Sequence, residues 1–211
     1  MSLWERRAFD LVKNFCGILI VLSGPSGIGK GTVISELIKR REKLKVSVSV
    51  TTREPRQGEK DGVDYFFTGR EKFLEMVQNS EFLEYAEYCN NFYGTPQKNV
   101  LNMLNEENDV ILEIDVKGAE QIKKKFSDAV SIFIAPKSED MLKERLLNRG
   151  LDSESVIKER IKQSEREIKS AINYDYLVVN DQLEKCVEDI IKIIEVEHMK
   201  AKRSSYIEKE G

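Results

Sequence analysis

Apolar and polar positions repeat along this chain with two periods, and these periods predict its strands and helices. Continuous apolar runs, which are typical of strands buried on both faces, cover residues 18–22, 110–115, 129–135 and 176–179. Apolar residues spaced three and four positions apart predict helices between these runs. The helices are expected over residues 33–39, 96–106, 116–125, 139–149, 153–171 and 182–194. Because strands and helices alternate, the pattern predicts an α/β fold with a right-handed, parallel, doubly wound sheet.

Capping residues mark the ends of two of these helices. Ser138 precedes two acidic residues and is expected to cap the helix that follows it, with Gly150 just past its end. Asp181 and Glu184 have the spacing of a capping box for the last helix. After that helix, the polar residues 197–211 are expected to fray.

Residues 51–98 depart from the regular alternation. The segment is rich in tyrosine and phenylalanine and is interrupted by proline and glycine. It follows an alternating stretch, residues 45–50, that predicts a strand, and it contains a helical pattern over residues 70–78. We therefore expect a small lobe of short strands with one helix, inserted into the core.

A glycine-rich stretch, GPSGIGKGT, separates the first strand from the first helix. Glycine tolerates backbone angles that side chains forbid, so consecutive N–H groups can turn inward around phosphate oxygens. The positive end of the helix and the charge of Lys30 act at the same place. The order of strand, loop and helix predicts a nucleotide-binding P-loop, and the alternative is a glycine-rich turn without a ligand. The loop consists of Gly24, Pro25, Ser26, Gly27, Ile28, Gly29, Lys30, Gly31 and Thr32.

Magnesium binding is expected to differ from the usual P-loop pattern. That pattern has Ser or Thr directly after the lysine, whereas here Gly31 stands there and Thr32 follows. We expect Mg2+ to be held mainly by water and the nucleotide phosphates, with a contact to Thr32 as the alternative. Asp115 ends a buried strand and is a second candidate, also mostly through water. No direct protein ligand is assigned.

Composition argues against several other classes of protein. A chain of 211 residues is long enough for one well-buried domain. Lys and Arg number 34 and Asp and Glu 37, and the net charge of -3 argues against a general nucleic-acid or membrane-surface binder. No run approaches the roughly 20 apolar residues that cross a bilayer. The three cysteines form no C-x-x-C pair, which favours a reducing cytoplasm over a disulfide framework or a zinc site.

The first residues of the chain carry an ambiguous signal. Basic residues precede the apolar run at 15–22, as in a signal peptide. The run is short, acidic residues interrupt the basic region, and the run leads directly into the P-loop. We therefore interpret it as the first strand, and we assign no role to the amphipathic residues 1–14.

Two arginines three positions apart follow the strand at 45–50. Arg53 and Arg56 are separated by Pro55, which stiffens the turn between them. Two guanidinium groups fixed near each other suit a phosphate dianion. The alternative is that they are ordinary surface arginines paired with Glu54 or Glu59.

Three further side chains of the lobe are candidates for ligand binding. Tyr65 and Tyr93 each offer a hydroxyl to a phosphate or a flat face to a base, although such tyrosines often pack in a core. Glu84 lies in an apolar-rich stretch where an acid is unusual. It is a candidate for reading a base, and a solvent-facing glutamate is the alternative.

Arginines are also spread over the helices at 139–171. Arg145 and Arg149 share a helix face, where unpaired like charges repel each other, and Arg160 follows on the next helix. A solvated basic face explains this pattern. A mobile segment that brings arginines to transferring phosphoryl groups explains it equally well.

Taken together, these pieces resemble the guanylate kinase family of nucleoside monophosphate kinases. The resemblance runs from about Ile18 to the C-terminal helix, and the stretch TTREPRQGE separates it from adenylate kinases. The other segments that carry it are GPSGIGKGT (24–32), SVSVTTREPRQGEKDGVDYFF (47–67), EFLEYAE (81–87), YGTP (93–96), LEIDVKGA (112–119) and LNRG (147–150).

The resemblance implies a role for each candidate. The residues around GMP would be Ser49, Arg53, Arg56, Glu59, Tyr65, Glu84, Tyr93, Thr95 and Asp115. Of these, Arg53, Arg56 and the two tyrosines would hold the phosphate, and Ser49, Glu84, Thr95 and Asp115 would face the guanine. The P-loop and Asn180 would bind ATP, with Asn180 near the adenine. Lys30, Arg53, Arg56, Arg145, Arg149 and Arg160 would form the catalytic set.

The resemblance also implies an activity and a division of the chain. The expected reaction is transfer of the γ-phosphoryl group of ATP, with Mg2+, to GMP and to dGMP, in the cytoplasm and without an obligatory protein partner. The expected core comprises residues 15–49, 99–136 and 172–198, the GMP-binding lobe residues 50–98, and a small helical lid residues 137–171. Two alternatives stay open: a kinase for another monophosphate such as AMP, and a scaffold domain that resembles guanylate kinase but lacks catalysis.

Overall fold

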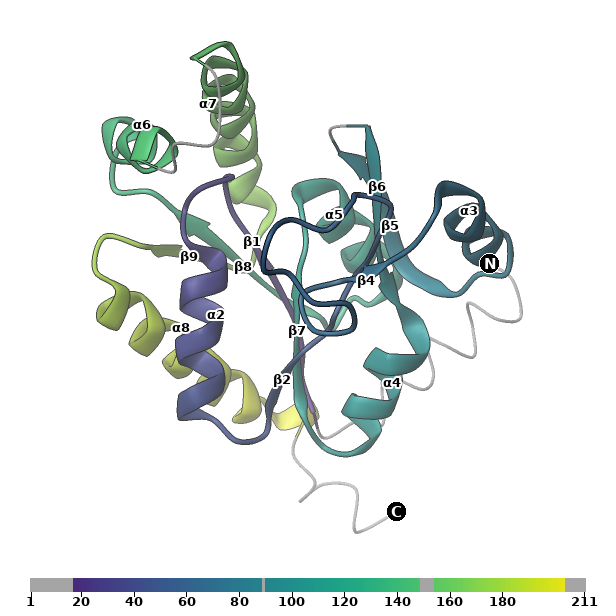
Figure 1. Ribbon diagram of the computed structural model, residues 1–211. Helices are drawn as coiled ribbons and strands as arrows, with labels where there is room; N and C mark the ends of the chain where they lie inside the picture. Colours follow the sequence, from purple (N-terminus) through teal and green to yellow (C-terminus); the bar gives the residue numbers. More distant parts are fainter. Residues whose placement is uncertain (1–16, 89, 149–153, 204–211) are drawn as a thin grey trace, which may run out of the picture.

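A five-stranded parallel sheet forms the centre of the protein. The computed structural model describes residues 17–88, 90–148 and 154–203. The order of the strands in this sheet is β2-β7-β1-β8-β9, and every neighbouring pair is parallel (Figure 1). The strands are β1 (Leu19–Ser23), β2 (Leu44–Val46), β7 (Asp109–Glu113), β8 (Val130–Ala135) and β9 (Tyr176–Val179). The predicted α/β class and parallel sheet are thus confirmed.

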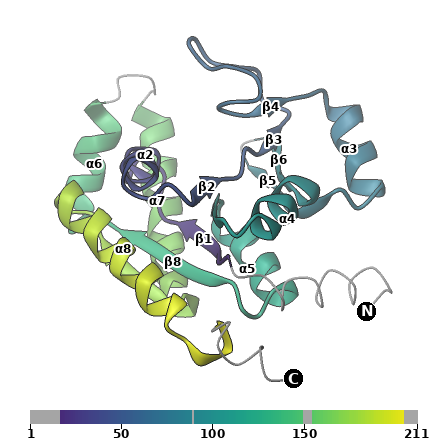
Figure 2. The same cartoon turned by 90° about the horizontal axis from the view of Figure 1, so that it is seen from below.

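Helices cover both faces of this sheet (Figure 2). Ile20 and Leu22 of β1 pack with α2 (Lys30–Arg40) and α8 (Leu183–His198), whereas Leu19 and Val21 pack with the helices of the opposite face. Those helices are α4 (Gln97–Asn105) and α5 (Val116–Lys125). Since successive side chains of a strand point to opposite faces, the continuous apolar run of β1 supplies both halves of the core.

A second, mixed sheet forms the lobe beside the core. Its strand order is β4-β3-β6-β5, in which β3 pairs parallel with β4 and antiparallel with β6. The lobe contains β3 (Val50–Thr51), β4 (Phe66–Phe67), α3 (Arg70–Gln78), β5 (Phe82–Tyr88) and β6 (Asn91–Pro96). Short strands with one helix were expected here, and α3 has the predicted bounds.

The strand predicted over residues 45–50 is wrong as a single element. β2 ends at Val46, and Ser47 donates the last backbone hydrogen bond to the core, to Ile111 at 3.0 Å. The chain then crosses to the lobe and resumes as β3, in a different sheet. Alternating polarity in the sequence continues through the crossing, so periodicity alone does not reveal the change of sheet.

The two predicted helix caps have different outcomes. Ser138 Oγ accepts a hydrogen bond from the backbone N–H of Met141 at 3.2 Å, which confirms the cap of α6 (Glu139–Asn148). The capping box at Asp181 is wrong: Gln182 precedes α8 without a side-chain cap, and the Asp181 carboxylate pairs with Lys137 at 2.8 Å instead. The predicted Gly150 stop lies outside the described residues.

Two helices stand beyond one edge of the core, at the top of Figure 1. α6 is followed by α7 (Glu154–Lys169), which continues into a 3-10 turn, η1 (Ser170–Asn173). Leu142 of α6 is buried against Ile161 of α7, so the two helices pack on each other.

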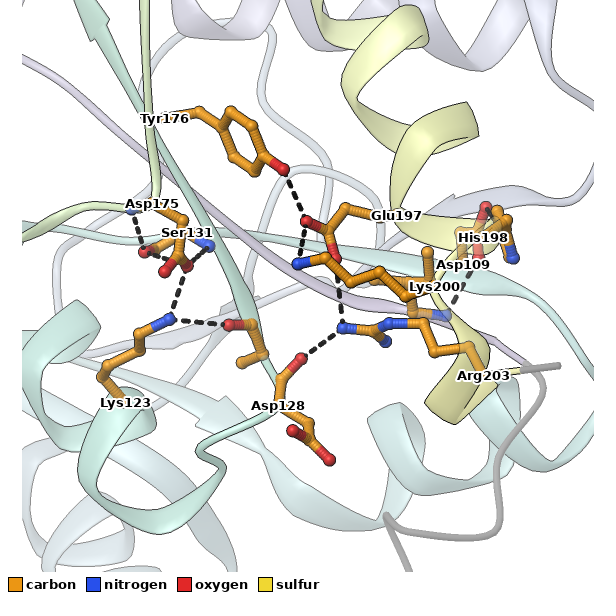
Figure 3. Close-up of polar contacts among 12 residues, drawn as sticks. Asp109, Lys123, Asp128, Ser131, Asp175, Tyr176, Glu197, His198, Lys200 and Arg203 are labelled. Atoms are coloured by element: carbon orange, nitrogen blue, oxygen red, sulfur yellow. Dashed lines mark hydrogen bonds and ion pairs between the residues drawn. The ribbon is translucent and has the colours of Figure 1, made fainter.

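Residues 197–203 are folded, contrary to the expectation that residues 197–211 fray, and residues 204–211 lie outside the described residues. Glu197, in the last turn of α8, is only 1% exposed, and a 3-10 turn, η2 (Ala201–Arg203), follows. The Glu197 carboxylate accepts a hydrogen bond from Tyr176 at 2.6 Å and pairs with Lys200 and Arg203 (Figure 3). The polar residues are thus held by one buried acid. None of the described helices is both long and apolar enough to span a membrane.

Candidate active site

The candidate residues gather at one edge of the core sheet, where the parallel strands end. The P-loop follows β1, Asp115 follows β7, and Asn180 follows β9. In open α/β sheets this carboxyl edge is the place where ligands bind. The lobe approaches the same edge, because it is inserted after β2 and returns through α4 to β7.

The P-loop is held in a conformation that needs glycine. Gly27 has φ 87° and Gly29 has φ 96°, which are left-handed backbone angles. Gly29 precedes α2 without a side-chain cap, so the first N–H groups of this helix have no side-chain acceptor from that residue. Lys30 Nζ donates to the carbonyl of Gly24 at 2.7 Å and to that of Pro25 at 3.3 Å. The loop, the start of the helix and the lysine together form a concave group of donors that suits phosphate.

Two predicted residues hold this loop through the Ile28 carbonyl. Asn180 is 4% exposed, and its Nδ2 donates to the Ile28 carbonyl at 2.8 Å. Arg145 of α6 donates to the same carbonyl at 2.7 Å and to the Asn180 carbonyl at 3.3 Å. The structure therefore brings Arg145 and Asn180 together at the P-loop. Arg160 lies half-buried on α7, and Arg149 lies outside the described residues.

Glu167 of α7 is a residue of this region that sequence reasoning missed. Gln163 donates to its carboxylate at 3.2 Å. Burial raises the pKa of Glu167, while the charge of Lys30 lowers it and that of Asp115 raises it. The carboxyl group is therefore within electrostatic reach of both Lys30 and Asp115. In the sequence, the one signal for Glu167 is its i, i+4 spacing from Gln163. Such pairs are common on helix surfaces, so the spacing does not single out Glu167 as a site residue.

Arg53 is held by a carboxylate and two aromatic rings. Its Nη2 lies 2.9 and 3.0 Å from the two carboxylate oxygens of Glu59, and its Nη1 donates to the Glu54 carbonyl at 2.7 Å. The guanidinium carbon lies 5.4 Å from the ring centroid of Tyr65 and 5.9 Å from that of Phe67. In the structure, Arg53 is therefore paired with Glu54 and Glu59, as the alternative to phosphate binding predicts. The side chain of Arg56 is exposed, and its backbone N–H donates to Glu59 at 2.8 Å.

The two tyrosines lie together beside Arg53. The ring centroids of Tyr65 and Tyr93 are 5.9 Å apart in an edge-on arrangement. Burial and the nearby Glu113 carboxylate raise the pKa of Tyr65 to about 12, so its hydroxyl keeps its proton and can donate it in a hydrogen bond. Arg53 and the tyrosines thus form one group of hydrogen-bond donors.

Glu84 lies at the inner end of the lobe, where it is 3% exposed. Thr95 donates its hydroxyl to Glu84 Oε1 at 2.6 Å. Burial and the charge of Asp115 raise the pKa of Glu84 to about 7, and the bond from Thr95 opposes this rise. The solvent-facing alternative for Glu84 is therefore wrong.

Asp115 and Ser49 border the same region. Asp115 caps α5 by accepting the backbone N–H of Gly118 at 2.8 Å. Ser49 lies where the chain crosses from core to lobe, and its carbonyl accepts from Phe66 at 2.9 Å. Thr32 is exposed in the first turn of α2, beside the P-loop.

Fold and site define a class of protein, the P-loop nucleotide kinases. A preformed phosphate loop follows the first strand of a parallel sheet, and a separate lobe presents an arginine, two tyrosines and a buried acid at the same edge. Within this class, the family model for guanylate kinase matches residues 17–197, and the chain belongs to the guanylate kinase family.

Relatives in sequence and structure agree with this family. The chain is 47% identical over 191 residues to a guanylate kinase of Desulfitobacterium hafniense (strain Y51), covering 90% of this chain and 96% of that protein. It is 48% identical over 190 residues to one from Carboxydothermus hydrogenoformans, covering 90% and 93%. The crystal structure of guanylate kinase from Anaplasma phagocytophilum matches with a TM-score of 0.76 and 38% identity over 90% of each chain.

Proposed function

We propose that the residues at the carboxyl edge of the core sheet carry out the reaction of this family, with the roles given below. The chain is an ATP:GMP phosphotransferase that makes ADP and GDP. The observation that carries the assignment of roles is the pairing of two sites at one edge: the P-loop with Lys30 on the core, and Arg53 with Glu84 on the lobe.

The phosphate of GMP is assigned to the arginine and tyrosine group. Arg53 and Arg56 supply guanidinium donors, and Tyr65 and Tyr93 supply hydroxyls. Glu59 holds Arg53 through both carboxylate oxygens, which fixes the direction of its remaining donors. The second pKa of a phosphate is about 6, so the attacking oxygen is already ionised near neutral pH and no general base is needed.

The guanine is assigned to the buried acid and its neighbours Ser49, Thr95 and Asp115. A Glu84 carboxylate can accept from the ring N–H and the exocyclic amine of guanine. Adenine has a lone pair at that ring nitrogen and lacks the amine, so it would leave a buried acid unpaired, at a cost of about 1–3 kcal/mol or more. The contacts proposed are to phosphate and base, so dGMP is expected to be an acceptor as well.

ATP is assigned to residues 24–32 and to the neighbourhood of Asn180. Loop N–H groups and Lys30 would bind its phosphates, and Arg145 and Arg160 would stabilise charge on the transferring group, with Arg149 as the third expected member. Catalysis on this assignment consists of alignment and charge neutralisation. The bonds of Asn180 and Arg145 to the Ile28 carbonyl support this assignment of ATP to the P-loop.

The donors present fit a magnesium ion that is held mainly by phosphates and water. Gly31 offers no side chain, the Thr32 hydroxyl is exposed beside the loop, and Asp115 Oδ1 is engaged by Gly118. Mg2+ commonly keeps several waters and takes few protein ligands in kinases. When bound with ATP, it supplies charge neutralisation at the β- and γ-phosphates.

Core, lobe and lid are proposed with the boundaries predicted above, residues 50–98 for the GMP-binding lobe and residues 137–171 for the lid. The mixed sheet supports the boundaries of the lobe, and the packing of α6 on α7 supports those of the lid. Because its substrates are nucleotides of the cell interior, we place the protein in the cytoplasm.

A coupled assay for ADP release tests this proposal. It is run with Mg-ATP and GMP, with AMP in place of GMP, and without an acceptor. Release that depends on GMP and is weak with AMP is the expected result. Release with AMP would overturn the assignment of the base site, and a protein that binds GMP without releasing ADP would favour the scaffold alternative.

A further inference from the structure

Gly118 occupies a helical position where glycine is unfavourable. It lies in the first turn of α5, a regular helix over residues 116–125, and it is not among the glycines with positive φ. Glycine is a poorer helix former than alanine, by about 1 kcal/mol in a helix interior. The backbone conformation therefore does not explain why glycine stands at this position.

The space beside Gly118 is filled by the carboxylate of Glu84. A Cβ atom at this position would lie 2.5 Å from Glu84 Oε2 and 3.1 Å from Glu84 Cδ. Such atoms essentially never approach within 3.0 Å, and ordinary contact begins near 3.4 Å. The carboxylate thus occupies the volume that any side chain at Gly118 would need.

Contacts on both sides of Glu84 draw α5 against β5. Lys125 donates to the Leu83 carbonyl at 2.7 Å. Gln121 donates to the Tyr85 carbonyl at 2.7 Å and accepts from the Tyr85 N–H at 3.3 Å. Because residues 83 and 85 are both tied to the same helix, the Glu84 side chain cannot withdraw by a shift of the strand alone.

Thr95 holds the other side of the carboxylate. Its hydroxyl donates to Oε1 at 2.6 Å, while Oε2 faces Gly118. The carboxylate is therefore positioned between a hydroxyl donor on β6 and the bare backbone of α5. A displacement of Oε2 from Gly118 would change the direction in which both oxygens point.

We propose that Gly118 is a positioning residue for guanine selectivity, because its lack of a side chain lets the Glu84 carboxylate sit against α5 in the orientation that reads the base. The inference rests on the proposed role of Glu84 in binding guanine. A purely structural explanation, close packing of helix and strand, would make Gly118 matter for stability and leave the choice of nucleotide unchanged.

The variant Gly118→Ala tests the inference by adding one methyl group. We expect kcat/KM for GMP to fall by roughly 10- to 100-fold, since a displacement near 1 Å can cost about that much. The KM for ATP and the weak kcat/KM for AMP should stay within about twofold of the parent values. The ratio of kcat/KM for GMP to that for AMP should therefore fall about as much as kcat/KM for GMP. The melting temperature should change by only a few degrees, because the better helix propensity of alanine offsets part of the cost of displacing the carboxylate.

A control is Gly69→Ala, which adds the same methyl group in the GMP-binding lobe, just before α3. Gly69 has φ -74°, and a Cβ atom there would meet no atom within 4 Å. This variant should keep the kinetic constants of the parent protein within about twofold, because the added methyl group would meet no neighbouring atom.

A second variant separates positioning from general disruption. Glu84→Asp shortens the acid by one methylene and should lower kcat/KM for GMP in the parent protein. In the Gly118→Ala background the same change should cost at least threefold less, because the shorter side chain no longer meets the added methyl group. Equal costs in the two backgrounds would overturn the inference.

The remaining outcomes are also decisive. Normal GMP kinetics in Gly118→Ala would overturn the inference, because the methyl group would then displace nothing. Equal losses for GMP and ATP, or loss of the stable fold, would also overturn it, because the methyl group would then displace more than the carboxylate. A parent protein that does not prefer GMP would instead overturn the proposed function, so the two failures are distinguishable.

Discussion

Lys30 bonds to the backbone of the P-loop and supplies it with a positive charge. A single substitution should remove both contributions without unfolding the protein. The Lys30 ammonium group bonds to the carbonyls of Gly24 and Pro25, and it is the full positive charge within the loop segment itself. We expect Lys30→Ala to lower kcat by roughly three orders of magnitude, because charge on the transferring phosphoryl group loses its main counterpart in the loop. Steady-state kinetics with saturating ATP and GMP measure the effect.

The control for this prediction lies on the same helix. Lys39 of α2 is exposed and pairs with Glu36 at 2.6 Å, so Lys39→Ala should leave kcat within about twofold. Circular dichroism should show that both variants are folded. Near-normal turnover of Lys30→Ala would contradict the role given to the lysine.

The titration of Glu84 should be visible in the stability of the protein without nucleotide. Burial and Asp115 raise its pKa from 4.5 to about 7, so between these values the folded protein binds a proton that the unfolded chain has lost. Stability must therefore fall as pH rises through this range, by about 3 kcal/mol for a shift of this size. The acid is retained in the site at a cost in stability.

Glu84→Gln removes this term and leaves the other titrating groups in place. Urea unfolding at pH 5 and pH 8 should show that the parent protein loses about 2 to 3 kcal/mol more than Glu84→Gln over this interval. Parallel pH profiles for the two proteins would contradict the raised pKa of Glu84.

At the scale of elements, the side chain of Arg145 joins α6 to the P-loop. Arg145 donates to the carbonyls of Ile28 and Asn180, which joins the helix to the loop and to the end of β9. We expect Arg145→Ala to lower kcat by about 100-fold and to raise the KM for ATP more than that for GMP. Lys143 is exposed on the same helix, and Lys143→Ala should match the parent protein. An equal change in the two KM values would argue against an action through the P-loop.

Elements with strong local signals could be predicted, and those decided by distant contacts could not. α3, α5 and β9 have the expected bounds, because apolar spacing, turn residues and caps lie within each segment. The strand expected at 45–50 divides between two sheets, and the capping box at Asp181 loses to an ion pair with Lys137, 44 residues away. In both cases a partner elsewhere in the chain outweighs the local pattern.

The same distinction applies to the site. The P-loop is one continuous segment, so its residues could be proposed from spacing and residue type alone. The bonds that join Asn180 and Arg145 to Ile28 span 152 and 117 residues, and Glu167 carries no chemical pattern that separates it from a surface glutamate. Gly118 could be seen as important only once the carboxylate of Glu84 was placed beside it.

At the scale of the whole molecule, stability and catalysis are separated along the sheet. Parallel strands place all their carboxyl ends at one edge, where the proposed nucleotide sites lie, and all their amino ends at the other. The polar cluster around Glu197 lies at the amino end: Tyr176 begins β9, and Arg203 donates to the carbonyl of Asp128, just before β8 (Figure 3). This cluster holds the last described turn against the core.

Glu197→Gln should therefore weaken the fold and leave the chemistry unchanged. The carboxylate is 1% exposed and compensates Lys200 and Arg203, so its loss leaves a largely buried guanidinium without its anion. We expect the free energy of unfolding to fall by about 2 kcal/mol, with kcat and both KM values within about twofold. Glu195 is the matched control, because its side chain is 53% exposed in a surface pair with Arg41, and Glu195→Gln should cost less than about 0.5 kcal/mol. A change in kinetic constants without a loss of stability in Glu197→Gln would show that the two ends of the sheet are coupled.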